Sequence, residues 1–283
     1  MEKALYFGEK PLVLAVTIQA VSKIELSMKL SDSDIWYGNY INRNIILSGE
    51  KTFYIRMPES PLIGILKIEN VHSHNDAGFK VVKLKVLPLD PHPEFYDSKD
   101  PMIKSFMTFI QGWAKRAKYL AAGNKVQVIP NSFFDEKTNT WQPGYFTLPK
   151  TYYSNDKRFR IDYVFECVNR VTGQVSTTPM RISEDRGIIE AAQKHVKPAS
   201  IPEIIAWSTH EFSHFFKNVN SSDEEEADWN GAKIFLGYGY SVADLLEGFR
   251  AVFEKRDNPQ NRARWEKFVK MAMDFDLKYN KYR

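Results

Sequence analysis

Two histidines separated by three residues, with a glutamate directly after the first, constrain this chain more than any other feature. They form the string His210-Glu211-Phe212-Ser213-His214, which lies between apolar runs at residues 204–207 and 215–216. An α-helix turns about 100° per residue, so side chains four apart lie on one face, one turn from each other. The spacing therefore predicts a helix on which two imidazoles can hold one metal ion.

The pattern H-E-x-x-H is typical of zinc hydrolases, in which the glutamate acts as a general base. Because Glu211 follows His210 directly, we expect its carboxylate beside the metal, where it can take a proton from a zinc-bound water. A chain with six histidines in 283 residues can also contain this pattern by chance. The alternative is therefore a helix whose histidines are ordinary hydrogen-bonded residues. A third ligand distinguishes these interpretations, since catalytic zinc takes three protein ligands and keeps one open position.

An acidic run follows the two histidines after a polar segment at residues 217–222, whose composition predicts a loop. The run reads Glu224-Glu225-Glu226-Ala227-Asp228 and opens a second predicted helix with apolar residues at helical spacing. One explanation of these carboxylates needs no metal: Ser221 and Glu224 fit a capping box, and acidic side chains stabilise a helix N-terminus. Capping does not account for two histidines placed one loop away.

With this acidic run the chain resembles the gluzincin metallopeptidases, whose third zinc ligand is the glutamate of an E-x-x-A/S-D motif on the following helix. The resemblance implies that Glu224 binds zinc together with His210 and His214. It also implies that Asp228, one turn further on, accepts a hydrogen bond from a ligand imidazole. Glu225 and Glu226 have no role in this scheme.

Residues 175–240 resemble, more loosely, the compact metallopeptidase-like proteins of tailed phages, the crAss-like group among them. The short gap of residues 215–223 between motif and third ligand carries this likeness. So does the segment before the motif, which predicts a strand, a tight turn at Asp185-Arg186-Gly187 and a second strand. A strand within residues 176–189 is our candidate for an edge that pairs with an extended substrate, as in zincins, and an ordinary edge strand is the equal alternative.

Alternating apolar and polar residues dominate the first ninety positions, most strictly at residues 23–30. This pattern and the short turns between segments predict an all-β, sandwich-like or barrel-like module at residues 1–90. The further predicted strands are residues 12–18, 44–47, 51–57, 62–68 and 79–87.

Four prolines between Pro88 and Pro101 predict a linker at residues 91–101. A zincin-like domain at residues 102–283 follows, with a long helix at 102–123 and strands at 125–129, 145–148 and 160–168 that would complete its sheet. Residues 171–174 predict a hairpin turn, and two amphipathic helices end the chain. The predicted fold class is α+β, in which a β-module precedes a mixed sheet, the H-E-x-x-H helix and C-terminal helices.

Composition limits which classes of partner we expect for this chain. The net charge of +4 and the absence of a long basic run give no indication of a nucleic-acid partner, and the basic residues of the last helices predict a solvated face. The apolar run at residues 12–16 is too short for a membrane span. Cys167 is the single cysteine, which favours a reducing compartment such as the cytoplasm of a host cell, without secretion. The resemblance to phage proteins implies a virion as the other location.

Other residues carry weaker hypotheses. Tyr238 or Tyr240 could donate to an oxyanion, but a turn with packed tyrosines is the better explanation. His72 and His74 lie in a polar segment that predicts a loop, and His92 lies between prolines. His195 is nearer the motif and could face a cleft, but nothing in the sequence fixes it there.

The sequence therefore predicts a zinc metallopeptidase that hydrolyses peptide bonds with a zinc-activated water and Glu211 as general base. Its expected partners are a protein or peptide substrate and, through the β-module, other virion proteins or a second copy of the chain. The alternative is a virion or tail component that uses the zincin fold as an assembly piece, because a fold does not fix a function. An intracellular protease that cleaves a regulator is a third candidate.

Overall fold

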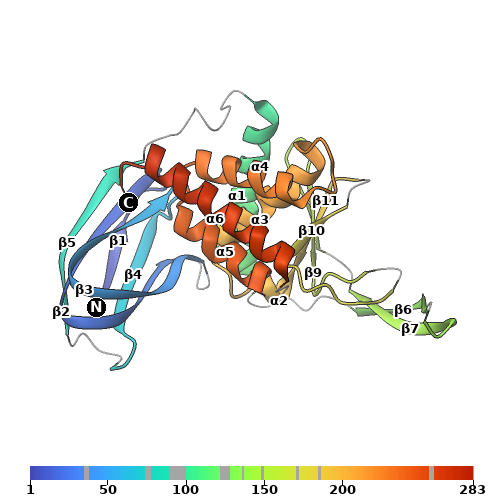
Figure 1. The fold of residues 1–283 in the computed structure, drawn as a ribbon, viewed down its shortest axis with the longest axis horizontal. Helices are drawn as coiled ribbons and strands as arrows, with labels where there is room; N and C mark the ends of the chain where they lie inside the picture. Colours follow the sequence, from blue (N-terminus) through green and yellow to red (C-terminus); the bar gives the residue numbers. More distant parts are fainter. Residues whose placement is uncertain are drawn as a thin grey trace.

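The described part of the chain folds into an antiparallel β-module, a mixed sheet and six helices, and the α+β class is confirmed (Figure 1). The computed structural model describes residues 1–34, 38–73, 78–89, 100–121, 128–135, 137–147, 150–169, 172–183, 186–254 and 258–282. Most of the predicted linker at 91–101 lies outside the described residues. No helix in the described ranges has the length and apolar content needed to cross a membrane.

Five antiparallel strands form the N-terminal sheet, in the order β1-β4-β2-β3 with β5 also paired to β2. The first half of β2 pairs with β5 and its second half pairs with β4, so these two strands follow one another along one edge of β2. The strands are β1 (Glu2–Tyr6), β2 (Leu12–Asp32), β3 (Asn39–Met57), β4 (Ile63–Asn70) and β5 (Phe79–Pro88).

Two of these strands are longer than the sequence indicated. The segments predicted as separate strands at 12–18 and 23–30 form one continuous strand, β2. Those predicted at 44–47 and 51–57 form another, β3. The breaks predicted within each of them were wrong. The β2–β3 register shifts between Ala20 and Ile24, opposite Gly49, which has a φ of 75°. A bulge and a glycine in the left-handed region bend a strand pair without ending it, although their residues look like turns.

A four-stranded mixed sheet in the order β10-β11-β9-β8 supports the second half of the molecule. Its inner strands β9 (Arg160–Val164) and β11 (Ile188–Ala192) run parallel, and β8 (Lys150–Tyr153) and β10 (Met180–Ile182) are the antiparallel edges. The predicted β10–β11 hairpin is confirmed, although Asp185 of its turn lies outside the described residues. The first residue of the predicted turn 171–174 also lies outside them.

The strands predicted at 125–129 and 145–148 do not complete this sheet, which is a correction. They belong to a separate hairpin, β6 (Val128–Asp135) with β7 (Thr140–Thr147), that projects from the body of the molecule (Figure 1). Because the two strands are close in sequence, each finds its hydrogen-bonding partner in the other and does not pair with a strand of the mixed sheet. Strand propensity predicts that a strand forms, not which strand it pairs with.

Six helices follow or flank the mixed sheet, and the third lies in the interior of the molecule. The predicted long helix is confirmed as α1, whose Phe106 stacks on Phe212 of α3 with ring centroids 4.2 Å apart. The helices are α1 (Pro101–Ala121), α2 (Gln193–Val196), α3 (Ile201–Phe216), α4 (Glu224–Gly237), α5 (Val242–Glu254) and α6 (Pro259–Tyr279).

The β-module packs directly on these helices, and buried apolar residues of both form one continuous core. Polar contacts fix the junction: Arg43 on β3 pairs with the buried carboxylate of Asp244 on α5, and Arg56 Nε donates to the carbonyl of Gly239 at 2.9 Å. Lys115 of α1 lies 2.6 Å from Glu59. The β-module is therefore held against the helices by charge pairs as well as by apolar contact.

Replacement of Arg43 by Ala should lower the free energy of unfolding by about 3 kcal/mol, because it leaves Asp244 buried without its cation. Burial raises the pKa of Asp244 and Arg43 opposes this rise, so removing Arg43 should raise the pKa further. A carboxyl whose pKa is raised in the folded state makes the protein less stable as pH rises. The free energy of unfolding lost in Arg43→Ala should therefore be larger at pH 8 than at pH 5. Urea unfolding at both values measures this, with the exposed Lys80→Ala as control; a deficit that does not change with pH would contradict this explanation.

Candidate metal centre

Helix α3 carries the H-E-x-x-H string and is fixed along its whole length. It begins with a capping box, in which the Ser200 hydroxyl accepts from the Glu203 amide at 3.3 Å and the Glu203 carboxylate accepts from the Ser200 amide. The buried hydroxyls of Ser208 and Ser213 donate to carbonyls one turn earlier, at 2.7 and 2.8 Å. These bonds let a helix with polar residues lie in an apolar interior.

Helix α4 lies against α3 at the position of a glycine. A side chain at Gly231 would come within 2.8 Å of the backbone nitrogen and Cα of His210, closer than such atoms approach. With no side chain there, the two backbones can touch. This contact sets the separation between the ligands on α3 and the acidic start of α4.

The two histidines and Glu224 bring three ligand atoms together. His210 Nε2 lies 3.1 Å from His214 Nε2 and 3.4 Å from Glu224 Oε2, and His214 Nε2 lies 3.8 Å from the same oxygen. For an ion with tetrahedral ligands at 2.0–2.1 Å, neighbouring ligand atoms lie about 3.3 Å apart. The observed distances match this spacing, so the group is close enough to hold a metal ion.

The other nitrogen of each imidazole faces a hydrogen-bond acceptor. His214 Nδ1 donates to the carbonyl of Ser221 at 2.7 Å. His210 Nδ1 lies 3.0 Å from Oδ1 of the buried Asp228, close but poorly aligned for a hydrogen bond. With Nδ1 carrying the proton, Nε2 of each ring keeps its lone pair for the metal. Asp228 therefore lies beside His210, and its role in orienting a zinc-bound imidazole stays a prediction.

Glu224 is not used to cap its own helix. Asp223 is the N-cap residue of α4 and accepts from the amide of Glu226 at 2.9 Å, while Glu226 reaches back to the amide of Val219. The capping box considered for Ser221 and Glu224 is therefore wrong, because a neighbouring aspartate caps the helix. Glu224 is left to face the histidines.

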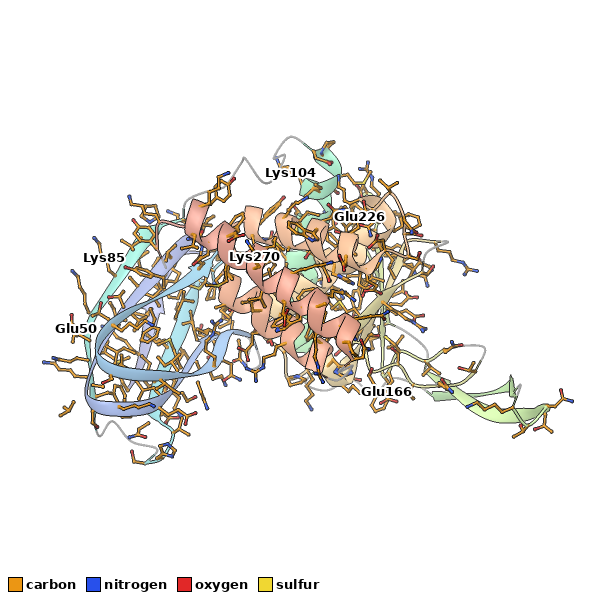
Figure 2. All side chains as sticks on the ribbon, viewed as in Figure 1. Glu50, Lys85, Lys104, Glu166, Glu226 and Lys270 are labelled. Atoms are coloured by element: carbon orange, nitrogen blue, oxygen red, sulfur yellow. The ribbon has the colours of Figure 1, made fainter. Side chains whose placement is uncertain are left out.

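Arg264 of α6 is a site residue that the sequence did not reveal. Its Nη2 lies 3.0 Å from Glu224 Oε2 and 2.9 Å from Asp228 Oδ1, and its guanidinium stacks over the Phe253 ring. We expected the basic residues of this helix to be solvated. This holds for Lys270, labelled in Figure 2, whose side chain is 75% exposed, but not for Arg264, whose side chain is 18% exposed. No local pattern distinguishes the two, because only the tertiary packing of α6 brings Arg264 to the site.

Opposite charges shift the pKa values of the site. His210 beside Glu224 lowers the pKa of that carboxyl to about 2, with Arg264 acting in the same direction. Burial lowers the pKa of His210, but Asp228 and Glu224 outweigh it and raise it to about 10. The acidic side chains thus favour a positive charge at the site. That charge is either a proton on His210 or a metal ion that replaces the proton.

Glu211 lies among these groups without belonging to the ligand set. Burial raises the pKa of its carboxyl, while His210 and His214 act against the rise. The backbone of Ile182 on β10 also acts against the rise. Glu211 therefore lies between the ligand cluster and the edge of the mixed sheet.

A cleft of about 320 Å³ opens over the ligand cluster. The cleft is lined by the edge strand β10 and the residues before it, and by apolar side chains of α3 and α5, namely Trp207, Phe249, Val252 and Phe253. The predicted edge strand within 176–189 therefore does lie beside the motif. Its pairing with a substrate stays a prediction.

The structure leaves the other candidate residues away from the cleft wall. Tyr240 is 3% exposed, stacks on Phe235 and accepts from Gln111 at 2.9 Å, as expected for a packed tyrosine. Neither it nor Tyr238 nor His195 lines the cleft. His72 lies 3.7 Å from Glu25 in the β-module, and His74 and His92 lie outside the described residues.

Compared with protein-family models, with curated proteins and with solved structures, the chain matches none of them. The motif and the geometry of its residues are therefore what support a metal site here. The gluzincin likeness and the phage likeness stay predictions from the sequence.

Replacement of Gly231 by Ala should force α4 away from His210 and lower the free energy of unfolding by about 2 kcal/mol. It should also weaken metal binding, because Glu224 and Asp228 move with α4. Gly112→Ala in α1 is the matched control, since nothing lies within 4 Å of an added Cβ and the change should stabilise by about 0.5–1 kcal/mol. Thermal unfolding with and without metal compares the two; equal metal affinity in both variants would contradict this role of Gly231.

Proposed function

We propose that the protein is a zinc-dependent metallopeptidase. The observation that carries the proposal is the set of three ligand atoms at tetrahedral spacing, His210 Nε2, His214 Nε2 and Glu224 Oε2, at the floor of a cleft. Three protein ligands leave one coordination position, which is the arrangement of catalytic rather than structural zinc. A cleft beside that position gives a substrate access to it.

The donor set favours zinc among common biological metals. Two imidazole nitrogens and one carboxylate oxygen suit zinc, whereas magnesium and calcium prefer oxygen ligands throughout. The Ser221 carbonyl orients His214 through its Nδ1, and Asp228 Oδ1 lies 3.0 Å from His210 Nδ1, the side on which zinc-binding histidines are usually held. Other transition metals accept the same donors, so metal analysis must identify the ion.

The protein's own residues supply the remaining parts of a hydrolytic site. A bound zinc ion would polarise a water molecule and a peptide carbonyl. Glu211 accepts the proton of the attacking water and passes it to the leaving amine, a task suited to a carboxyl whose pKa burial has raised. The exposed edge of β10 holds the peptide extended, and the aromatic wall at Phe249 and Phe253 excludes water.

The purified protein should contain about one zinc per chain, and Glu224→Ala should lose it because one of three ligands is gone. Glu225→Ala is the matched control, since the neighbouring side chain pairs with Lys267 on the surface. Metal content by mass spectrometry after dialysis distinguishes them. Full retention of zinc by Glu224→Ala would rule out Glu224 as the third ligand.

Glu211→Gln should keep the zinc but lower peptide hydrolysis by about 100-fold or more, because an amide cannot take the proton. The exposed Glu247→Gln on α5 should leave the rate unchanged. Cleavage of an unfolded protein substrate, followed by mass spectrometry, gives the rates. A wild-type chain that holds zinc and cleaves nothing would instead favour a virion or tail component in which the site is structural.

A further inference from the structure

The loop between α3 and α4, at residues 217–223, contains the carbonyl that orients His214. His214 Nδ1 donates to the carbonyl of Ser221 at 2.7 Å, which leaves the lone pair of Nε2 for a metal. A histidine held by a backbone carbonyl depends on the conformation of the peptide that carries this carbonyl. The orientation of His214 is therefore only as well fixed as the loop.

Apolar packing does not hold this loop in place. None of the residues 217–223 is buried, and Val219 is 98% exposed. A segment with few buried apolar contacts opens easily unless polar bonds restrain it. The hydrogen bonds of the loop are therefore what fixes the Ser221 carbonyl.

Glu226, labelled in Figure 2, lies in the first turn of α4 and accepts the central hydrogen bonds of the loop. The Val219 amide donates to both of its carboxylate oxygens, at 3.0 and 3.1 Å, and the Asn220 amide donates to Oε2 at 3.3 Å. Hydrogen bonds to an ionised carboxylate are about twice as strong as neutral ones. Asn220 Oδ1 in turn accepts from the Ser222 amide at 3.1 Å, which forms a tight turn with Ser221 at its centre. One carboxylate thus holds the two residues that precede Ser221.

Capping of α4 does not explain these bonds of Glu226. In a capping box the third helical residue returns to the amide of the N-cap residue, which here is Asp223. The Asp223 amide instead donates to the carbonyl of Asn220 at 3.0 Å, and the Asp223 side chain caps the helix by accepting from the Glu226 amide at 2.9 Å. The carboxylate of Glu226 passes the N-cap residue and accepts from amides further back. It therefore organises the loop rather than the end of the helix.

We propose that Glu226 is a positioning residue of the metal site: it holds the loop so that the Ser221 carbonyl stays on His214 Nδ1 and Nε2 stays directed at the metal. This inference rests on the metal site of the proposed function. Among the described residues no hydrogen bond joins Glu226 to either histidine of the motif, so the loop transmits its effect. The acidic run then serves the site twice, since Glu224 faces the metal and Glu226 orients another ligand.

Zinc affinity measures this effect, and the chain contains a matched control. Glu226→Ala should raise the dissociation constant for zinc about 10-fold, as loss of a group that orients a ligand does. Glu225→Ala removes the same charge from the same helical turn, but this side chain pairs with Lys267 on the surface, so the affinity should not change. Glu226→Gln keeps one acceptor oxygen for the Val219 amide and should lose less affinity than Glu226→Ala. Competition with a chromophoric chelator gives the three dissociation constants.

A proton resonance reports the orientation of His214 without any metal. In metal-free protein labelled with 15N-histidine, the Nδ1 proton of His214 gives an NMR signal only while its hydrogen bond protects it from exchange with water. We expect this signal in the wild type and in Glu225→Ala, and its loss in Glu226→Ala, at a temperature where thermal unfolding shows all three to be folded.

Either measurement can overturn the proposal. A retained Nδ1 signal in Glu226→Ala would do so, and so would a zinc affinity equal to that of Glu225→Ala. A wild type that binds no zinc would overturn the proposed function, whereas loss of the Nδ1 signal in Glu226→Ala would still support the role of Glu226 in orienting His214.

Discussion

The approach of α4 to α3 at Gly231 is the contact on which the candidate site depends. Both histidines come from α3, while Glu224 and Asp228 come from α4, so these side chains come close enough to hold a metal ion only at the separation that this contact sets. The capping box at Ser200 and the bonded hydroxyls of α3 hold one helix, and the Asp223 cap holds the start of the other. Two well-defined helices and one glycine thus place donors from two segments around a single point.

Positively charged neighbours then hold the two acidic side chains of the site, Glu224 and Asp228, in place. Asp228 is almost fully buried and lies between His210 and Arg264, and Arg264 also contacts Glu224. An ionised carboxylate in the interior needs such partners, since alone it would take up a proton or destabilise the fold. Because Arg264 belongs to α6, the last helix of the chain fixes ligands that lie far from it in sequence.

Local patterns predicted much of this structure. The 3.6-residue period gave α1 and the two motif helices, and the E-x-x-A-D offset placed Glu224 and Asp228 beside the histidines. Long-range packing was not predictable in the same way. The bulge opposite Gly49 looked like a turn, the β6–β7 hairpin looked like part of the mixed sheet, and Arg264 looked like the exposed Lys270. In each case the deciding partner lies on another element, which a single sequence does not identify.

X-ray absorption at the zinc edge on the 283-residue chain identifies the atoms bound to the metal without needing a substrate. We expect four nitrogen or oxygen neighbours at about 2.0–2.1 Å, outer-shell scattering from two imidazoles, and no sulfur. Loss of one imidazole in His214→Ala should be visible in the outer shell. A spectrum without imidazole scattering, or with six distant oxygen neighbours, would contradict a site built by His210, His214 and Glu224.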